Sequence, residues 1–139
     1  MDSLQAAILS YRLTRLDEVI HQRRRNAELY RSILMPEFVF VPEENCSEFN
    51  TYHTFVIQTD DRDALKKYLA AKGISTSVHY PIPIHLQPAS SHLGYKVGDF
   101  PYAESQASRI LTLPVNQYMT EGEIITVAQT VNKFFQTDR

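Results

Sequence analysis

The chain has 139 residues, a length that suits one domain with a modest hydrophobic core. Hydrophobic residues make up 43% and charged residues 22% of the sequence, which is ordinary globular composition and argues against disorder. A formal net charge of -2 provides no general attraction to nucleic acid or to an anionic membrane. The basic run Arg23-Arg24-Arg25 is more typical of a helix face whose arginines are solvated or paired with acids.

Cysteine use and hydropathy indicate the compartment. The single cysteine, Cys46, cannot form a disulfide within the chain, which favours the reducing cytoplasm. Glu43, Glu44 and Glu48 surround it with negative charge, which opposes thiolate formation and makes a nucleophilic role unexpected. No apolar run approaches the length of a membrane span. We therefore expect a cytoplasmic protein with no nucleic-acid or membrane partner.

The first 35 residues predict one long helix. Apolar residues recur at spacings of three and four from residue 2 to residue 34, and Asp2 or Ser3 can cap the first turn. At about 1.5 Å per residue, this helix would be roughly 50 Å long, which exceeds the width of a compact domain of this size. We therefore expect part of it to project, or to pack on another domain, a second copy or residues missing from this chain.

Residues 36–139 predict a small α/β domain. Its expected strands are 38–41, 51–58 and 74–78, with a further extended piece at 111–115, and its expected helices are 62–72 before Gly73, one from Pro101, and one from the capping box of Thr120 and Glu123. The order strand, helix, strand with short joints favours an α/β, α+β-like sandwich. We expect residues 1–139 to form a single domain whose small, mostly antiparallel sheet of about three strands is covered by helices on at least one face.

The stretch from His79 to Pro88 combines two histidines, a tyrosine and three prolines. Proline fixes its own φ and biases the preceding residue toward extended geometry, so this part of the loop 79–101 is expected to be stiff. It follows directly on the predicted strand 74–78, and strand ends are a common location for ligand contacts. Two interpretations remain open, because the histidines can belong to a binding wall or can hydrogen-bond to the backbone of a rigid linker.

Other chemical motifs are not found. His79 and His85 lie six residues apart across prolines, which matches no common zinc spacing, so no metal site is expected. The four glycines are scattered and do not form a phosphate-binding loop. No serine or cysteine has the surroundings of a nucleophile elbow. The sequence therefore predicts no self-contained active site and no catalytic residue.

Four groups of residues carry a resemblance to a known family. They are Met1–Ile8 with Leu16-Asp17 and Arg23–Tyr30, then Arg62–Leu65 with Gly73-Ile74, then His79–Pro81 through Gln87-Pro88, and finally Leu93–Lys96 with Gly98–Glu104 and Leu113-Pro114. Together they resemble the DegT/DnrJ/EryC1/StrS family of pyridoxal-phosphate-dependent sugar aminotransferases. The proline-histidine stretch followed by the Gly-Tyr-Lys and Gly-Asp-Phe-Pro runs is specific in combination, and the resemblance covers nearly the whole chain.

The resemblance implies that the chain is the carboxy-terminal part of such an enzyme. Residues 1–35 would be the long connecting helix, and residues 36–139 the small domain of a fold-type I aminotransferase. The large domain, which binds pyridoxal phosphate and supplies its Schiff-base lysine, would lie upstream. A Schiff-base lysine needs a desolvated amine beside a phosphate cradle, and Lys96, the one lysine in a loop near polar groups, has no such cradle. We therefore expect no cofactor-binding residue here and no transamination by this chain alone.

The resemblance also implies a substrate site. His79, Tyr80, His85 and Lys96 would line or border the pocket for an amino-sugar nucleotide. The sequence departs from the family pattern at Asn116-Gln117, where an aromatic residue or proline is more typical, and this leaves the local turn open. Two functions remain: the carboxy-terminal domain of a nucleotide-sugar aminotransferase, or a free-standing non-catalytic module for dimerisation or sugar-nucleotide binding. Either predicts a homo-oligomer or association with a full-length aminotransferase.

Overall fold

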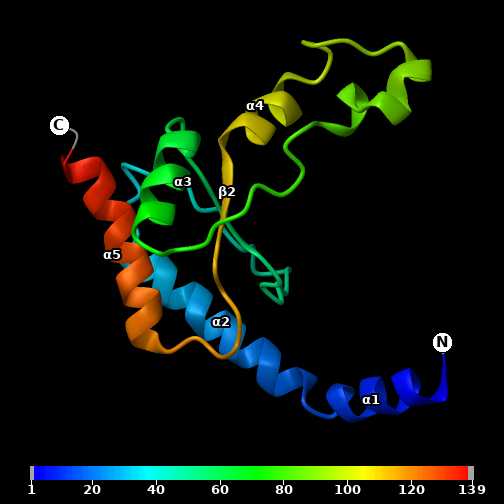
Figure 1. Cartoon of the computed structure of the whole chain (residues 1–139), viewed down its shortest axis with the longest axis vertical. Helices are drawn as coiled ribbons and strands as arrows, with labels where there is room; N and C mark the ends of the chain where they lie inside the picture. Colours follow the sequence, from blue (N-terminus) through cyan, green and yellow to red (C-terminus); the bar gives the residue numbers. More distant parts are fainter. Residues whose placement is uncertain (1, 138–139) are drawn as a thin grey trace.

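The computed structural model describes residues 2–137 (Figure 1). Two antiparallel strands lie between helices, and an extended segment and the first helix both project from the body on the same side of the view. The elements in chain order are α1 (Ser3–Leu13), α2 (Leu16–Ile33), β1 (Phe55–Gln58), α3 (Arg62–Ala71), the 3₁₀ helices η1 (Ile84–Leu86) and η2 (Pro88–Leu93), α4 (Pro101–Arg109), β2 (Ile110–Leu113) and α5 (Glu121–Thr137).

The hydrophobic core joins the two strands to three helices. In the antiparallel register Phe55 lies opposite Leu113 and Ile57 opposite Leu111, and all four side chains are buried. Alternate residues of a strand share one face, which explains why Phe55 and Ile57 enter the core while Val56 is only partly covered. The core continues into α2, α3 and α5 through Ala27, Tyr30, Leu65, Leu69, Ile124, Val127, Ala128 and Val131.

The sheet is smaller than the sequence predicts, with two strands instead of about three. The predicted strands 38–41 and 74–78 each contribute one isolated antiparallel bridge, Phe40 with Gln58 and Ser77 with Thr112. The predicted strand 51–58 begins only at Phe55, because Tyr52 has a φ of 47° and so leaves the extended conformation. The antiparallel sheet covered by helices is confirmed, and its number of strands is corrected.

The predicted single helix of residues 2–34 is divided into α1 and α2. Thr14 directs its hydroxyl to the carbonyl oxygen of Tyr11 at 2.7 Å, and the amide of Arg15 bonds to the carbonyl oxygen of Arg12 at 3.1 Å. These three-residue bonds replace the regular four-residue pattern and end the first helix. The expected cap at Asp2 is confirmed, because its Oδ1 accepts from the amide of Gln5 at 2.9 Å.

The helix α1 projects from the body without contributing to its core. None of residues Ser3–Leu13 is buried. Six large apolar side chains in and just after this helix are between 44% and 71% exposed: Leu4, Ile8, Leu9, Tyr11, Leu13 and Leu16. Isolated helices of this length are marginal in water, so α1 is expected to gain stability from whatever covers its apolar side chains.

The other helix signals are confirmed where they are local in sequence. Gly73 ends α3 with a φ of 76°, and Pro101 occupies the first turn of α4. Thr120 and Glu123 form the capping box, with Glu123 Oε2 accepting from the Thr120 amide at 2.8 Å and the Glu123 amide donating to Thr120 Oγ1 at 3.3 Å. Within the loop 79–101, Pro88 instead opens the short helix η2.

None of the helices in residues 2–137 combines the length and hydrophobicity that crossing a membrane requires.

One hydrogen bond between α2 and the segment after β2 gives a test of this packing. Tyr30 is fully buried, and its hydroxyl donates to the carbonyl oxygen of Pro114 at 2.7 Å. We expect Tyr30→Phe to lower the free energy of unfolding by about 1–2 kcal/mol, because the Pro114 carbonyl loses its partner. Tyr118→Phe, the same change at a residue that is 85% exposed, should stay within about 0.5 kcal/mol. Equal urea midpoints for the two variants would contradict the packing described.

Candidate functional site

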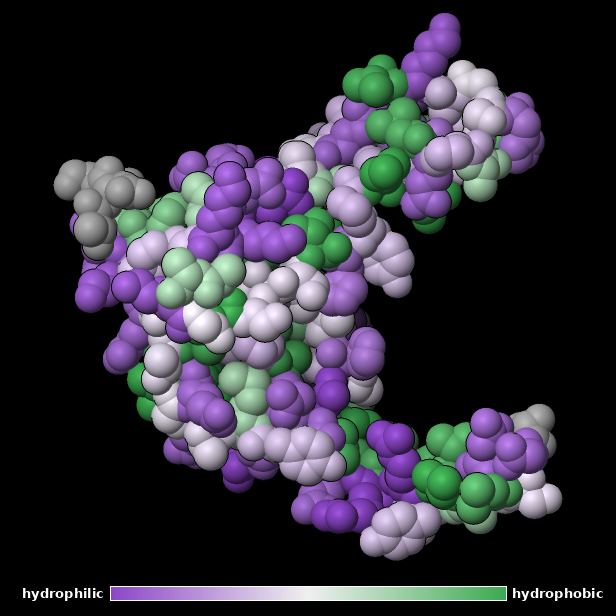
Figure 2. Space-filling view, in the orientation of Figure 1, coloured by the Kyte–Doolittle hydropathy of each residue, from purple (hydrophilic) through white to green (hydrophobic). Residues whose placement is uncertain are grey.

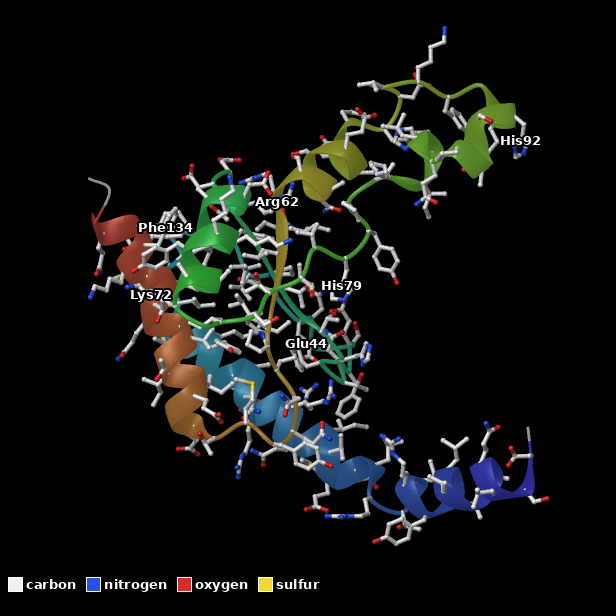
Figure 3. All side chains as sticks on the ribbon, in the orientation of Figure 1. Glu44, Arg62, Lys72, His79, His92 and Phe134 are labelled. Carbon is white, nitrogen blue, oxygen red and sulfur yellow. The ribbon has the colours of Figure 1, made fainter. Side chains whose placement is uncertain are left out.

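We call residues 79–109 the arm, because they extend from the body as one projection and return to it at β2 (Figure 1). His79 lies at its base. The ring Nδ1 of His79 shares a hydrogen bond of 2.8 Å with the hydroxyl of Thr112, a buried residue of β2. This bond fixes the orientation of the imidazole, and Figure 3 shows His79 on the side of the body from which the arm and α1 extend. His79 is therefore anchored to the sheet while it remains exposed to solvent.

Tyr80 is held in an unfavourable backbone conformation beside His79. Its φ is 59°, in the left-handed region that bulky L-residues rarely adopt, and its side chain is 81% exposed. The rings of His79 and Tyr80 are 6.4 Å apart. Strained residues that carry exposed functional side chains are concentrated at ligand sites. The pair is thus a candidate contact for a ligand in front of the sheet.

His85 faces the interior of the arm instead of the space beside it. Its side chain is only 8% exposed, and its Nε2 lies 3.0 Å from Oε1 of Glu104 on α4. Its ring packs against Phe100 with 4.7 Å between the ring centres. Lys96 lies on an exposed turn in which its amide donates to Asp99 Oδ2 at 2.8 Å. The structure therefore brings together His79 and Tyr80, while the proposed ligand contacts of His85 and Lys96 remain predictions.

The space between the arm and α1 is hollowed in the space-filling view (Figure 2). A hollow of roughly 1170 Å³ runs along α1 and the beginning of α2 and reaches the segments at Thr51, His53 and Gln117-Tyr118. A smaller one of roughly 330 Å³ lies along residues 50–56 and the side chain of Arg31. His53, which lies within the predicted strand 51–58, is exposed, precedes β1 and borders both hollows.

The loop 42–54 forms one wall of these hollows, and arginines of α2 hold it in place. Arg23 donates from Nη1 to the carbonyl oxygens of Tyr52 and His53 at 3.1 and 3.0 Å. Arg24 donates to Oε1 of Glu44 at 2.8 Å and to the carbonyl oxygen of Asn50 at 2.7 Å. The basic run thus includes an arginine paired with an acid, as its composition indicates, and its main effect is to fix the backbone of this wall.

Sequence reasoning missed these supporting residues. Glu44 lies 20 residues from Arg24, and the acceptor of Arg23 Nε is Gln117, which lies 94 residues away. No spacing rule connects such positions. One available signal was the departure from the family pattern at Asn116-Gln117. The Asn116 carbonyl accepts from the buried side chain of Asn26 at 2.9 Å, and Gln117 accepts from Arg23. Asn116 and Gln117 therefore both bind α2.

The lysines of the described residues all lie in contact with solvent. All five lysines, Lys66, Lys67, Lys72, Lys96 and Lys133, are exposed. A Schiff-base lysine requires a desolvated or charge-lowered amine next to groups that bind phosphate. Among residues 2–137, no three histidine, cysteine or acidic side chains are grouped so that they could hold a metal ion. The arrangement can present an aromatic pair to a ligand.

A small helix-covered sheet with a proline-rich arm beside a projecting helix is found in an aminotransferase family, as comparisons with known proteins show. Residues 1–132 match the model of the DegT/DnrJ/EryC1/StrS aminotransferase family, and the chain belongs to this family. It is 36% identical over 139 residues to a pleiotropic regulatory protein of Geobacillus stearothermophilus, covering 98% of this chain and 37% of that protein.

Two further similarities concern a curated transaminase and a solved structure. The chain is 35% identical to the dTDP-3-amino-3,6-dideoxy-alpha-D-galactopyranose transaminase of Aneurinibacillus thermoaerophilus, covering 96% of this chain and 36% of that protein. It superposes with a TM-score of 0.92 and 33% identity on DesV of S. venezuelae, solved in complex with a ketimine intermediate, covering 96% of this chain and 36% of that one. The chain therefore spans a little more than a third of the length of these relatives.

The Arg24–Glu44 pair gives a pH-dependent test of the wall. Hydrogen bonds from Arg24, from the Asn50 amide and from Tyr52 lower the pKa of Glu44 from 4.5 to about 2, against an opposing effect of burial. Because the pKa is lower in the folded state, these bonds contribute stability above pH 4.5 and lose it as the pH falls toward 2. We expect Glu44→Gln to be less stable than the wild type at pH 7, and the difference in unfolding free energy to shrink across this interval. Glu43→Gln is the control, and a pH-independent difference for Glu44→Gln would contradict the assignment.

The strain at Tyr80 can be measured by two substitutions that remove the same ring. Tyr80→Gly should be more stable than Tyr80→Ala by about 1 kcal/mol, because glycine adopts positive φ without the steric cost that alanine retains. Urea unfolding of both variants provides the measurement. Alanine as stable as glycine would mean that residue 80 does not occupy the left-handed region in solution.

Proposed function

We propose that this chain is the carboxy-terminal small domain of a nucleotide-sugar aminotransferase, and that the arm and α1 border a site completed by residues outside it. The observation that carries the proposal is the superposition on DesV, with a TM-score of 0.92 over 96% of this chain but 36% of that one. Such a match supports a role as one part of a composite enzyme. The chain is similar to a dTDP-3-amino-3,6-dideoxy-alpha-D-galactopyranose transaminase, and this similarity supports a sugar nucleotide as the substrate class.

His79 and Tyr80 are the residues of this chain that we propose contact the sugar nucleotide. His79 presents a fixed imidazole because Thr112 holds its Nδ1, which leaves Nε2 to bond with a hydroxyl or phosphate oxygen. Tyr80 presents an exposed ring and hydroxyl from a backbone that is already constrained, so little conformational entropy is lost on binding. Together they would orient the sugar nucleotide and exclude water from one side of it.

We propose that pyridoxal phosphate is held by the part of the enzyme that corresponds to the remaining length of the relatives. The exposed lysines and the lack of a phosphate cradle in the described residues support this division. We therefore propose that the chain does not transaminate alone.

A chimera provides the test of this function. The matching third of DesV is replaced by residues 1–132 of this chain, and cofactor binding, native mass and amino transfer are measured beside those of unaltered DesV. We expect a chimera that binds pyridoxal phosphate and retains amino transfer. His79→Ala and Tyr80→Ala should each lower kcat/KM by about tenfold or more, because a polar or stacking contact with the bound sugar nucleotide is lost.

The control variant for the chimera is His92→Ala. His92 lies at the far end of the arm, and its Nδ1 contacts only the carbonyl oxygen of Ala89 in its own turn (Figure 3). This variant should leave kcat/KM unchanged. A folded chimera that loads cofactor and keeps full activity with both His79 and Tyr80 replaced would refute their role.

The exposed apolar residues of α1 favour a second candidate function, a non-catalytic module that associates with itself or with a full-length aminotransferase. Leu4 is 71% exposed, and an unpartnered apolar helix face of this kind is typical of an interface. If the second candidate holds, sedimentation of the isolated chain gives a mass that rises with concentration, and Leu4→Glu with Ile8→Glu abolishes the rise. A monomer at all concentrations would rule out self-association.

For either function, the single exposed cysteine supports the cytoplasm as the compartment.

A further inference from the structure

Glu104 is at the centre of the most connected polar cluster in the arm. Its carboxylate accepts from the amide of Gly98 at 2.9 and 3.0 Å, from the amide of Phe100 at 3.3 Å, and lies 3.0 Å from Nε2 of His85. These partners come from both chain segments of the arm, the outgoing one that contains His85 and the returning one that contains Gly98. The side chain of Glu104 is 18% exposed, so the cluster is largely shielded from water.

The donors around Glu104 determine the protonation of the cluster. Burial raises the pKa of Glu104, but the bonds from Gly98, Phe100 and His85 together outweigh it and leave the pKa below its ordinary value of 4.5. The carboxylate is therefore ionised near neutral pH and can only accept hydrogen bonds. It follows that Nε2 of His85 carries a proton, so a neutral His85 ring is the Nε2–H tautomer. Gly98, whose amide donates to the carboxylate, has a φ of 98°, a conformation that other residues rarely adopt.

Two anchors therefore define the segment that carries Tyr80. At one end His79 is bonded to Thr112 in the sheet, and at the other His85 is bonded to Glu104. Between them, Pro81 and Pro83 fix two of the intervening φ angles and leave the connection little freedom. A strained conformation such as that of Tyr80 persists only if its surroundings over-determine it. The side chain of Gln87 adds a bond to the carbonyl oxygen of Ile82 at 3.1 Å between the two anchors.

We propose that Glu104 is a positioning residue that closes the arm through His85, Gly98 and Phe100 and thereby holds Tyr80 in its left-handed conformation. The proposal rests on the proposed function in one respect, which is that Tyr80 contacts the sugar nucleotide. It reassigns His85, which the sequence suggests as a ligand contact, to support of the neighbouring contact. Glu104 itself touches no substrate in this account.

The first measurement is made on the wild-type chain by nuclear magnetic resonance. We expect the ring nitrogens of His85 to report the Nε2–H tautomer at high pH, and the amides of Gly98 and Phe100 to exchange with solvent more slowly than in an unstructured peptide. The coupling constant between the amide and α protons of Tyr80, with its carbon shifts, should report positive φ. A neutral His85 protonated at Nδ1, or unprotected amides at Gly98 and Phe100, would overturn the proposal without any variant.

The second measurement uses Glu104→Ala, with Asp99→Ala as the matched control. Asp99 is a carboxylate of the same turn and accepts from the Lys96 amide, so its removal tests whether any lost acid disturbs the arm. We expect Glu104→Ala to accelerate exchange at Gly98 and Phe100 by about tenfold or more. The φ reporters of Tyr80 should shift toward negative φ, whereas Asp99→Ala should leave both readouts at Gly98, Phe100 and Tyr80 unchanged.

The response of Tyr80 distinguishes a positioning role of Glu104 from a role in stabilising the turn alone. Accelerated exchange at Gly98 and Phe100 with unchanged φ reporters at Tyr80 would show that Glu104 stabilises the turn but positions nothing, and would overturn the proposal. Slow exchange at Ile57 and Leu111, which pair in the sheet, verifies that each variant is folded. If Glu104→Ala does not fold, Glu104→Gln retains the shape and one acceptor and should give a smaller change in the same direction. All readouts are taken without substrate, so failure here leaves the proposed function to its own chimera test.

Discussion

The hydrogen bonds of Thr112 connect the sheet to the arm, and the arrangement of the candidate site depends on them. Thr112 pairs with Val56 of β1 on one side, and on the other side it exchanges backbone hydrogen bonds with Ser77 at 2.8 and 3.2 Å. Its buried hydroxyl also meets the ring of His79 at 2.8 Å. A backbone that is bonded on both edges cannot shift without breaking strand pairing, so the base of the arm inherits the rigidity of the core. The position of His79 is thus set by the sheet, although His79 itself is exposed.

Sequence reasoning succeeded where the determinants of structure are local and failed where they are not. The cap at Asp2, the stop at Gly73 and the box of Thr120 and Glu123 act within about four residues, and each was predicted. The strands depend on partners far along the chain, and an apolar run such as 38–41 does not reveal that only Phe40 will find one. The division of the first helix at Thr14 was also missed, because a side chain competing for a helical carbonyl leaves no periodic signal.

The same distinction applies to the candidate site. The proline-rich stretch was recognised from its composition, and His79 with Tyr80 does lie on an exposed, anchored segment. The direction of the His85 side chain depends on Glu104, which lies 19 residues further along and on a different helix. Residue type alone could not separate a histidine that faces solvent, as His79 does, from one that faces a carboxylate. Arg23 and Arg24 illustrate the converse, since a run that suggested only a charged surface holds the wall of the hollow through carbonyl oxygens.

Three features of the described chain are costly in isolation and make sense as parts of a larger structure. The apolar side chains of α1 are exposed to water, Tyr80 occupies a disfavoured backbone conformation, and the hollow of roughly 1170 Å³ lies along α1 and the beginning of α2. The core of α2, α3, α5 and the two strands does not require any of these features, because it closes without residues 2–13 and without the outer arm. Under the proposed function they have one common explanation. On that proposal, the core is that of the small domain, and its two projections meet surfaces supplied by the rest of the aminotransferase.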